Sequence, residues 1–223
     1  GIKSGEMSFA HGAAHESPFS VWITGEVVEA LIHAPAEQFA RPLDTFDLAN
    51  SAILLTPDTA GYVSVARQIS TLPTDPNGGT SLALGDDDAA SVFLAQARSV
   101  SLYGQDYRSF YVGSNGYITF TQSDTDYSES LADHFDTPRI SVLFDDLNPS
   151  GGGQVSWRQL ANRVVVTWDA VSVVGASSPN TMQVEMYFDG RIQLAWLATA
   201  SQEGIVGLSA GSGVPDGVVE TDF

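Results

Sequence analysis

Hydrophobic and polar residues alternate in short runs along most of the chain, and the longer period of an amphipathic helix is scarce. Between residues 139 and 211, six such runs are separated by Gly, Pro, Asn or Asp: RISVLFDDL, GQVSWRQL, NRVVVTWDAV, NTMQVEMYFD, RIQLAWLA and GIVGLSAG. A period of two is typical of a β-strand. Short strands at this spacing predict an all-β fold, an antiparallel, jelly-roll-like β-sandwich with at most one or two short helices.

Turn residues divide these runs into hairpins. Asn115-Gly116 lies between two alternating runs, and Asn-Gly is the strongest short signal for a two-residue hairpin turn. Asp189-Gly190 is expected to close a second hairpin, and residues 57–61 a third. The polar stretch at residues 128–134 is the most favourable place for a helix.

The alternation in residues 183–188 predicts which way the side chains of one strand point. One face carries the apolar residues Val184, Met186 and Phe188, and the other carries Gln183, Glu185 and Tyr187. This pattern indicates a sheet with one buried face and one face in contact with water.

Two parts of the chain differ in regularity. Residues 1–45 show little periodicity and contain three of the ten prolines. We expect this part to form strands and a linker, either separate from the sandwich or packed on it. Residues 46–223 contain no tandem repeat and no low-complexity linker, and they predict a single β-sandwich domain.

The charge balance narrows the classes of partner. The chain has 27 acidic and 9 basic residues, and its net charge of −18 repels phosphate backbones and anionic lipid. We therefore expect neither nucleic-acid binding nor membrane insertion, and no apolar run approaches the roughly 18 residues of a membrane-spanning helix. The lack of cysteine removes disulfides, thiol nucleophiles and thiolate metal sites. Together with the acidity, it favours an exported bacterial protein.

The order of several motifs resembles a known family. FYVGSNGYITF, ISVLFDDLNP, GGQVSW, RVVVTWDAV, NTMQVEMYFDGRIQLAW and GIVGLSAG follow one another as in the nidogen-type (NIDO-like) extracellular β-sandwich module. Relatives of this module occur as non-catalytic parts of secreted bacterial proteins, including extensions of subtilisin-like peptidases. The resemblance implies a secreted or cell-surface location, an adhesion or interaction role, and other domains of the parent polypeptide as partners. The chain lacks the cysteines and EGF-like segment of the animal modules, so no basement-membrane role is implied.

Adjacent carboxylates at one strand end raise the question of metal binding. Asp145 and Asp146 follow the run RISVLF, and successive side chains of a strand point to opposite faces, so one of them should face inward. They then cannot easily act as an acid and base on one substrate. In one interpretation, the inward carboxylate accepts hydrogen bonds from loop N–H groups and the outer one is solvated. In the other, they contribute to a calcium site, because Ca²⁺ takes six to eight oxygen ligands. The candidate ligands are Asp145, Asp146, Asn148, Asp86, Asp87 and Asp88.

One motif resembles the nucleophile of a hydrolase. GLSAG at residues 207–211 matches the pattern Gly-x-Ser-x-Gly, with Ser209 as the nucleophile. The nucleophile elbow, however, needs a strand, a turn and a helix in an alternating α/β chain, and here glycines and a proline follow the motif. The sequence therefore favours a protein that is not an enzyme, with a serine hydrolase using Ser209 as the least favoured alternative.

Tyrosines near a turn offer a surface for a ligand. Tyr103, Tyr107 and Tyr111 flank the turn at residues 103–105, and exposed aromatic rings stack on sugars. A carbohydrate-binding module is thus the main alternative function. The leading interpretation is a non-catalytic extracellular interaction or adhesion module that binds a protein or glycan ligand, with Ca²⁺ as its candidate cofactor.

Overall fold

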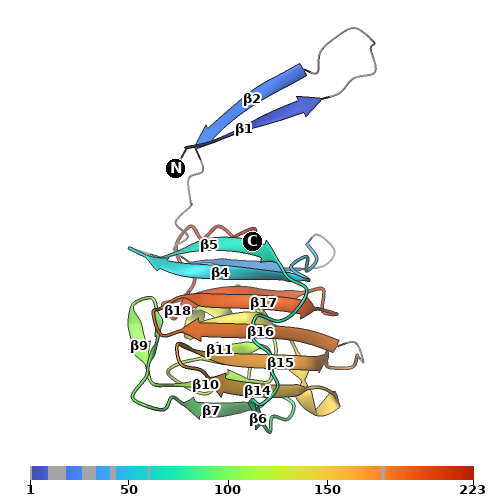
Figure 1. Ribbon diagram of the computed structural model, residues 1–223. Helices are drawn as coiled ribbons and strands as arrows, with labels where there is room; N and C mark the ends of the chain where they lie inside the picture. Colours follow the sequence, from blue (N-terminus) through green and yellow to red (C-terminus); the bar gives the residue numbers. More distant parts are fainter. Residues whose placement is uncertain (1, 10–18, 27–33, 41–43, 60, 177–178) are drawn as a thin grey trace. The chain divides into compact units, whose positions relative to one another are not determined.

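The computed structural model describes residues 2–9, 19–26, 34–40, 44–59, 61–176 and 179–223 (Figure 1). The contacts between residues divide the chain into two compact units, Gly1–Ala30 and Leu31–Phe223. In the first unit, β1 (Ile2–Phe9) pairs with β2 (Phe19–Glu26) in antiparallel register, from Ile2 opposite Glu26 to Phe9 opposite Phe19. The second unit contains the sandwich.

One layer of the sandwich is an eight-stranded antiparallel sheet, whose strands Figure 1 shows stacked from β5 to β6. Its main path has the order β5-β4-β17-β16-β15-β14-β6, and β13 pairs with β15 beside that path. The strands are β4 (Ser51–Asp58), β5 (Gly61–Gln68), β6 (Thr80–Leu82), β13 (Leu147–Asn148), β14 (Gln154–Gln159), β15 (Arg163–Val173), β16 (Pro179–Tyr187) and β17 (Ile192–Ala198).

The other layer is a six-stranded antiparallel sheet with the order β3-β18-β12-β11-β10-β7. Its strands are β3 (Ala36–Phe39), β7 (Ala89–Phe93), β10 (Ser109–Gly113), β11 (Tyr117–Thr119), β12 (Pro138–Phe144) and β18 (Gly204–Ala210). A separate hairpin consists of β8 (Val100–Leu102) and β9 (Gln105–Tyr107).

Helical structure in the described residues is limited to α1 (Leu131–Asp136) and the 3₁₀ turn η1 (Pro149–Gly151). Helix α1 starts at Leu131 because the side chain of Ser130 accepts a hydrogen bond from the Asp133 N–H at 3.1 Å, which satisfies a free donor of the first turn. The helix expected at residues 128–134 is therefore present and begins three residues later.

The hydrophobic core fills the space between the two sheets, and two tryptophans of the eight-stranded sheet reach across it. Trp168 in β15 donates a hydrogen bond to the carbonyl of Gly113 in β10 at 3.0 Å. Trp196 in β17 donates to the carbonyl of Val142 in β12 at 2.7 Å. Both side chains are fully buried, so their polar atoms need these partners. The predicted all-β antiparallel sandwich is confirmed, as are the six predicted strands after residue 138.

The predicted solvent-facing side of β16 is wrong for two residues. Gln183 and Glu185 are 0% and 1% exposed. The segment between β5 and β6 covers them: the Gln183 side chain bonds the N–H and the carbonyl of Thr74 at 2.9 and 2.8 Å, and Glu185 accepts a bond from the Thr74 hydroxyl. The outer face of this sheet is thus partly closed by a distant segment, and its polar residues form an internal hydrogen-bond network.

Candidate functional site

Asp145 is the inward-facing member of the aspartate pair; the sequence predicted that one of the two would face inward, but not which one. It directly follows β12 and is 5% exposed. Its carboxylate accepts hydrogen bonds from the hydroxyl of Ser201 and, at 2.8 Å, from the N–H of Asp146. Burial raises the pKa of Asp145, and these two hydrogen bonds act in the opposite direction. Asp145 therefore anchors two loops to each other.

Asp146 faces outward and meets two aspartates from another loop. Carboxylate oxygens of Asp86, Asp87 and Asp146, which we call the aspartate cluster, all lie within 4.8 Å of one another. Burial raises the pKa of Asp146, and the negative charges of Asp87 and Asp86 raise it further. The cluster thus places three like charges together at the end of β12, a geometry that a divalent cation would stabilise.

The aspartate cluster is held in place by Asn115, which sequence reasoning treated only as a turn residue. Its side-chain nitrogen donates to the carboxylate of Asp87 at 3.0 Å and to the carbonyl of Asp126 at 3.0 Å. Its side-chain oxygen accepts from the N–H of Leu147 at 3.0 Å. This one fully buried amide therefore connects both loops that supply the cluster. The only sequence signal at this position is the Asn115-Gly116 pair, which indicates a turn and not a role in holding the cluster.

Two further residues proposed as calcium ligands, Asp88 and Asn148, bond to their own turns. Asp88 accepts from the N–H groups of Gly85 at 3.1 Å and Ala89 at 2.8 Å. Asn148 caps η1 by accepting from the N–H groups of Ser150 at 2.9 Å and Gly151 at 3.1 Å. Of the six residues, the structure brings three into one cluster.

The three tyrosines do not share one surface. The Tyr103 hydroxyl donates to the carbonyl of Leu208 at 3.2 Å, and its ring lies edge-to-face on Tyr62 with centroids 5.1 Å apart. The ring of Tyr107 packs on Phe120, with centroids 4.7 Å apart. Tyr111 is half-buried in β10, which pairs with β7 and β11. Tyr103 lines a pocket that has a volume of about 290 Å³ and is formed by the β4–β5 and β8–β9 turns.

Ser209 lies inside the sheet and not on an exposed elbow. It is 0% exposed in β18, and its hydroxyl donates to the carbonyl of Thr137 at 2.9 Å. The nearby histidine, His134, has its Nδ1 at 2.9 Å from the hydroxyl of Ser141 instead. Burial and the charge of Arg139 lower the pKa of His134 to about 3. A neutral, buried imidazole bonded to another serine does not form a nucleophile–base pair with Ser209.

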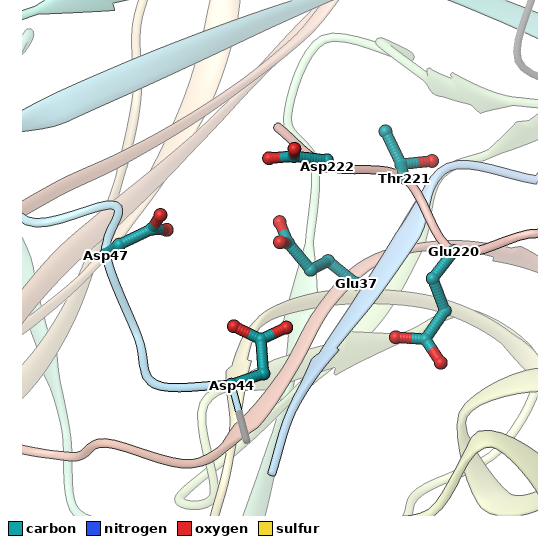
Figure 2. A pocket seen from close by; sticks show the side chains of 6 residues that line it. All are labelled: Glu37, Asp44, Asp47, Glu220, Thr221 and Asp222. Atoms are coloured by element: carbon teal, nitrogen blue, oxygen red, sulfur yellow. The ribbon is translucent and has the colours of Figure 1, made fainter. Parts of the chain in front are cut away.

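A second acidic feature, which we call the acidic pocket, was not predicted. It has a volume of about 300 Å³ and is lined by Glu37, Asp44, Asp47, Glu220, Thr221 and Asp222. Figure 2 shows the carboxylates of Glu37, Asp47 and Asp222 directed towards the same space. These residues come from β3, from the segment that follows it and from the last residues of the chain, so no local sequence pattern reveals the pocket.

Comparison with protein families identifies the family of the chain. The family model described as "NIDO related" matches residues 62–219. The match begins in β5 and extends past the end of β18. The chain belongs to the NIDO-related family. No curated protein and no solved structure matches the chain.

Only one of the two acidic features lies in the part of the chain that matches the NIDO-related family. The aspartate cluster lies inside the matched residues, whereas all six residues that line the acidic pocket lie outside them. The NIDO-related domain is a non-enzymatic type of module, and domains of the nidogen type are typically extracellular. Within the described part of this NIDO-related chain, no helix has the length and hydrophobicity needed to cross a membrane.

Proposed function

We propose that the sandwich is a non-catalytic extracellular module that mediates interaction or adhesion for a larger secreted or cell-surface bacterial protein. The family match over residues 62–219 is the observation that carries this proposal. The buried position of Ser209 and the neutral state of His134 support a role without catalysis. The net charge of −18 favours protein or glycan ligands over nucleic acid, and other domains of the parent polypeptide are further partners.

Protease treatment of intact cells that make the protein tests the extracellular location. We expect an added protease to remove the module from immunoblots of whole cells, or the module to be present in the medium. A cytoplasmic enzyme in the same sample serves as the control for cell integrity. A module that is absent from the medium and survives until the cells are lysed would contradict the proposal.

The pocket beside Tyr103 favours a glycan as one class of ligand. It is lined by the half-buried Tyr103 and the exposed Asp58 together with residues of the two turns, and thus combines an aromatic ring with a carboxylate that can accept hydrogen bonds from sugar hydroxyls. Slower migration in gels that contain a soluble polysaccharide, lost in Asp58→Ala, would assign a glycan ligand to this pocket. Equal migration of both proteins in every polysaccharide gel would remove the glycan alternative.

We also propose that the aspartate cluster binds Ca²⁺. Adding millimolar calcium to metal-stripped protein should raise the melting temperature by roughly 3–10 °C when calcium is 10- to 100-fold above its Kd, because a ligand of the native state stabilises that state by mass action. Asp146→Asn should abolish the rise. The measurement is thermal unfolding followed by tryptophan fluorescence, since Trp168 and Trp196 are fully buried.

Asp216→Asn provides the matched control, because Asp216 is an exposed carboxylate outside the cluster. Its melting temperature should respond to calcium as the wild type does. Without calcium, Asp146→Asn should melt no lower than the wild type, because the substitution removes a charge next to Asp86 and Asp87. A calcium response that persists in Asp146→Asn would place the cation elsewhere.

A further inference from the structure

The last residues of the chain lie along the outer edge of β3. We call residues 219–223 the C-terminal segment. Its Thr221 N–H donates to the carbonyl of Ala36 at 2.8 Å, and its Glu220 carboxylate accepts from the N–H of Gln38 at 3.1 Å. On its other side, β3 pairs with β18. The segment thus occupies backbone groups of β3 that would otherwise remain free at a sheet edge.

A third contact joins the C-terminal segment to a buried carboxylate. The N–H of Phe223 donates to Glu37 at 3.2 Å, and the ring of Phe223 packs against the hydrophobic core. Glu37 is 6% exposed, so its ionised form has little water to stabilise it. This contact makes the position of the segment sensitive to the charge of Glu37.

The acidic pocket surrounds Glu37 with further negative charges. Asp44 and Asp47 face it from the segment after β3, and Glu220 and Asp222 line the pocket from the C-terminal segment (Figure 2). The paired strand β18 (Gly204–Ala210) brings no titratable side chain. Among the described residues that line the pocket, none is basic. An ionised Glu37 therefore meets like charges from both segments packed against it.

We propose that the C-terminal segment is a proton-dependent latch, which is docked on β3 when Glu37 is protonated and released when Glu37 is ionised. The neutral side chain keeps an oxygen that accepts the Phe223 N–H, while it removes one negative charge from the pocket. Ionisation adds a charge beside Asp47 and Asp222, and it does so on a residue that is largely buried. Release uncovers the carbonyl of Ala36 and the N–H of Gln38, the groups through which a sheet edge pairs with another strand.

The pKa of Glu37 sets the pH range of the latch. Burial is the largest cause that raises it, from 4.5 to about 7; the Phe223 hydrogen bond lowers it, and the charges of Asp47, Asp222 and Asp44 raise it. The docked state therefore binds the proton more tightly than the released state. Docking is fully stabilised below pH 4.5, weakens as the pH rises towards 7, and stays weak above it. Between pH 5.5 and pH 8, the docking equilibrium constant should fall by at most on the order of 30-fold, the value reached if release returns the pKa of Glu37 to 4.5.

Amide hydrogen exchange of Thr221 and Phe223, corrected for the intrinsic dependence of exchange on pH, tests the latch. We expect protection of both amides to fall between pH 5.5 and pH 8, while the amide of Val166 in the core strand β15 stays protected. Glu37→Gln should keep both amides protected at both pH values, because glutamine keeps the acceptor and carries no charge. Wild-type protection that is equal at pH 5.5 and pH 8 would overturn the proposal.

Two further variants keep the test decisive. Asp222→Asn should move the loss of protection to lower pH, because it removes one charge that raises the pKa of Glu37. Glu129→Gln is the matched control, since burial also raises the pKa of Glu129 but that residue does not line the pocket. If Glu129→Gln removes the pH dependence of Thr221, or if Asp222→Asn leaves it unchanged, the latch at Glu37 is wrong.

Discussion

Replacing Glu185 by alanine should lower the free energy of unfolding by about 3 kcal/mol, because it removes the buried carboxylate of an ion pair and leaves its partly buried partner Arg163 without a counter-charge. The Glu185 carboxylate lies 3.2 Å from Nε of Arg163, and it accepts hydrogen bonds from the hydroxyls of Thr74 and, at 2.6 Å, Tyr187. The expected loss is at the lower end of the range for such pairs because the Arg163 side chain is 22% exposed. Urea unfolding followed by tryptophan fluorescence measures the change.

An exposed ion pair at the end of the same strand provides the control. Asp189 and Arg191 face each other at 2.8 Å across the β16–β17 turn, and their side chains are 57% and 39% exposed. Asp189→Ala should cost only about 0–1 kcal/mol, because water and salt screen a surface pair. Equal losses in Glu185→Ala and Asp189→Ala would show that the segment around Thr74 does not seal the outer face of the sheet in solution.

Local features of the fold could be predicted from the sequence, whereas the burial that separates these two ion pairs could not. The positions of the strands and of the hairpins at Asn115-Gly116 and Asp189-Gly190 were predicted correctly because alternation and turn chemistry are local properties of the chain. The strand registers give both hairpins a loop with an odd number of residues, so neither is the two-residue turn that these pairs favour. The burial of Glu185 was not predicted, because the residue that covers it, Thr74, is 111 positions away. A polar strand face carries the same pattern whether water or a distant loop lies against it.

The candidate sites also combine local features, which the sequence predicts, with long-range contacts, which it does not. Strand alternation predicted that one of Asp145 and Asp146 faces inward, but it could not say which one. The strand before them is buried on both faces, and the fold identifies Asp145 as the buried residue. The meeting of Asp146 with Asp86 and Asp87 was proposed from residue chemistry, but only the fold selects these three of the six candidates. The acidic pocket combines segments almost two hundred residues apart, which no local pattern indicates.

Replacing Gly116 by alanine should destabilise the fold and disorder the aspartate cluster together. Gly116 has φ of +76°, and an added Cβ would lie 1.9 Å from the carbonyl oxygen of Leu143 in β12. The left-handed conformation costs a side chain roughly 1–2 kcal/mol, and forcing atoms into a packed region costs about 1–3 kcal/mol more. We therefore expect a loss of about 2–5 kcal/mol in urea unfolding. Because Asn115 precedes this glycine and holds Asp87, the proposed calcium response should also disappear.

Gly104→Ala separates the steric effect from the backbone effect. Gly104 has nearly the same φ, +78°, but an added Cβ would meet no atom within 4 Å. Its alanine variant should lose only about 1–2 kcal/mol and keep the proposed calcium response, since the β8–β9 turn supplies no residue to the aspartate cluster. Similar losses in both variants would mean that the contact between Gly116 and β12 relaxes at little cost. A calcium response that survives in Gly116→Ala would mean that Asn115 is not needed to form the cluster.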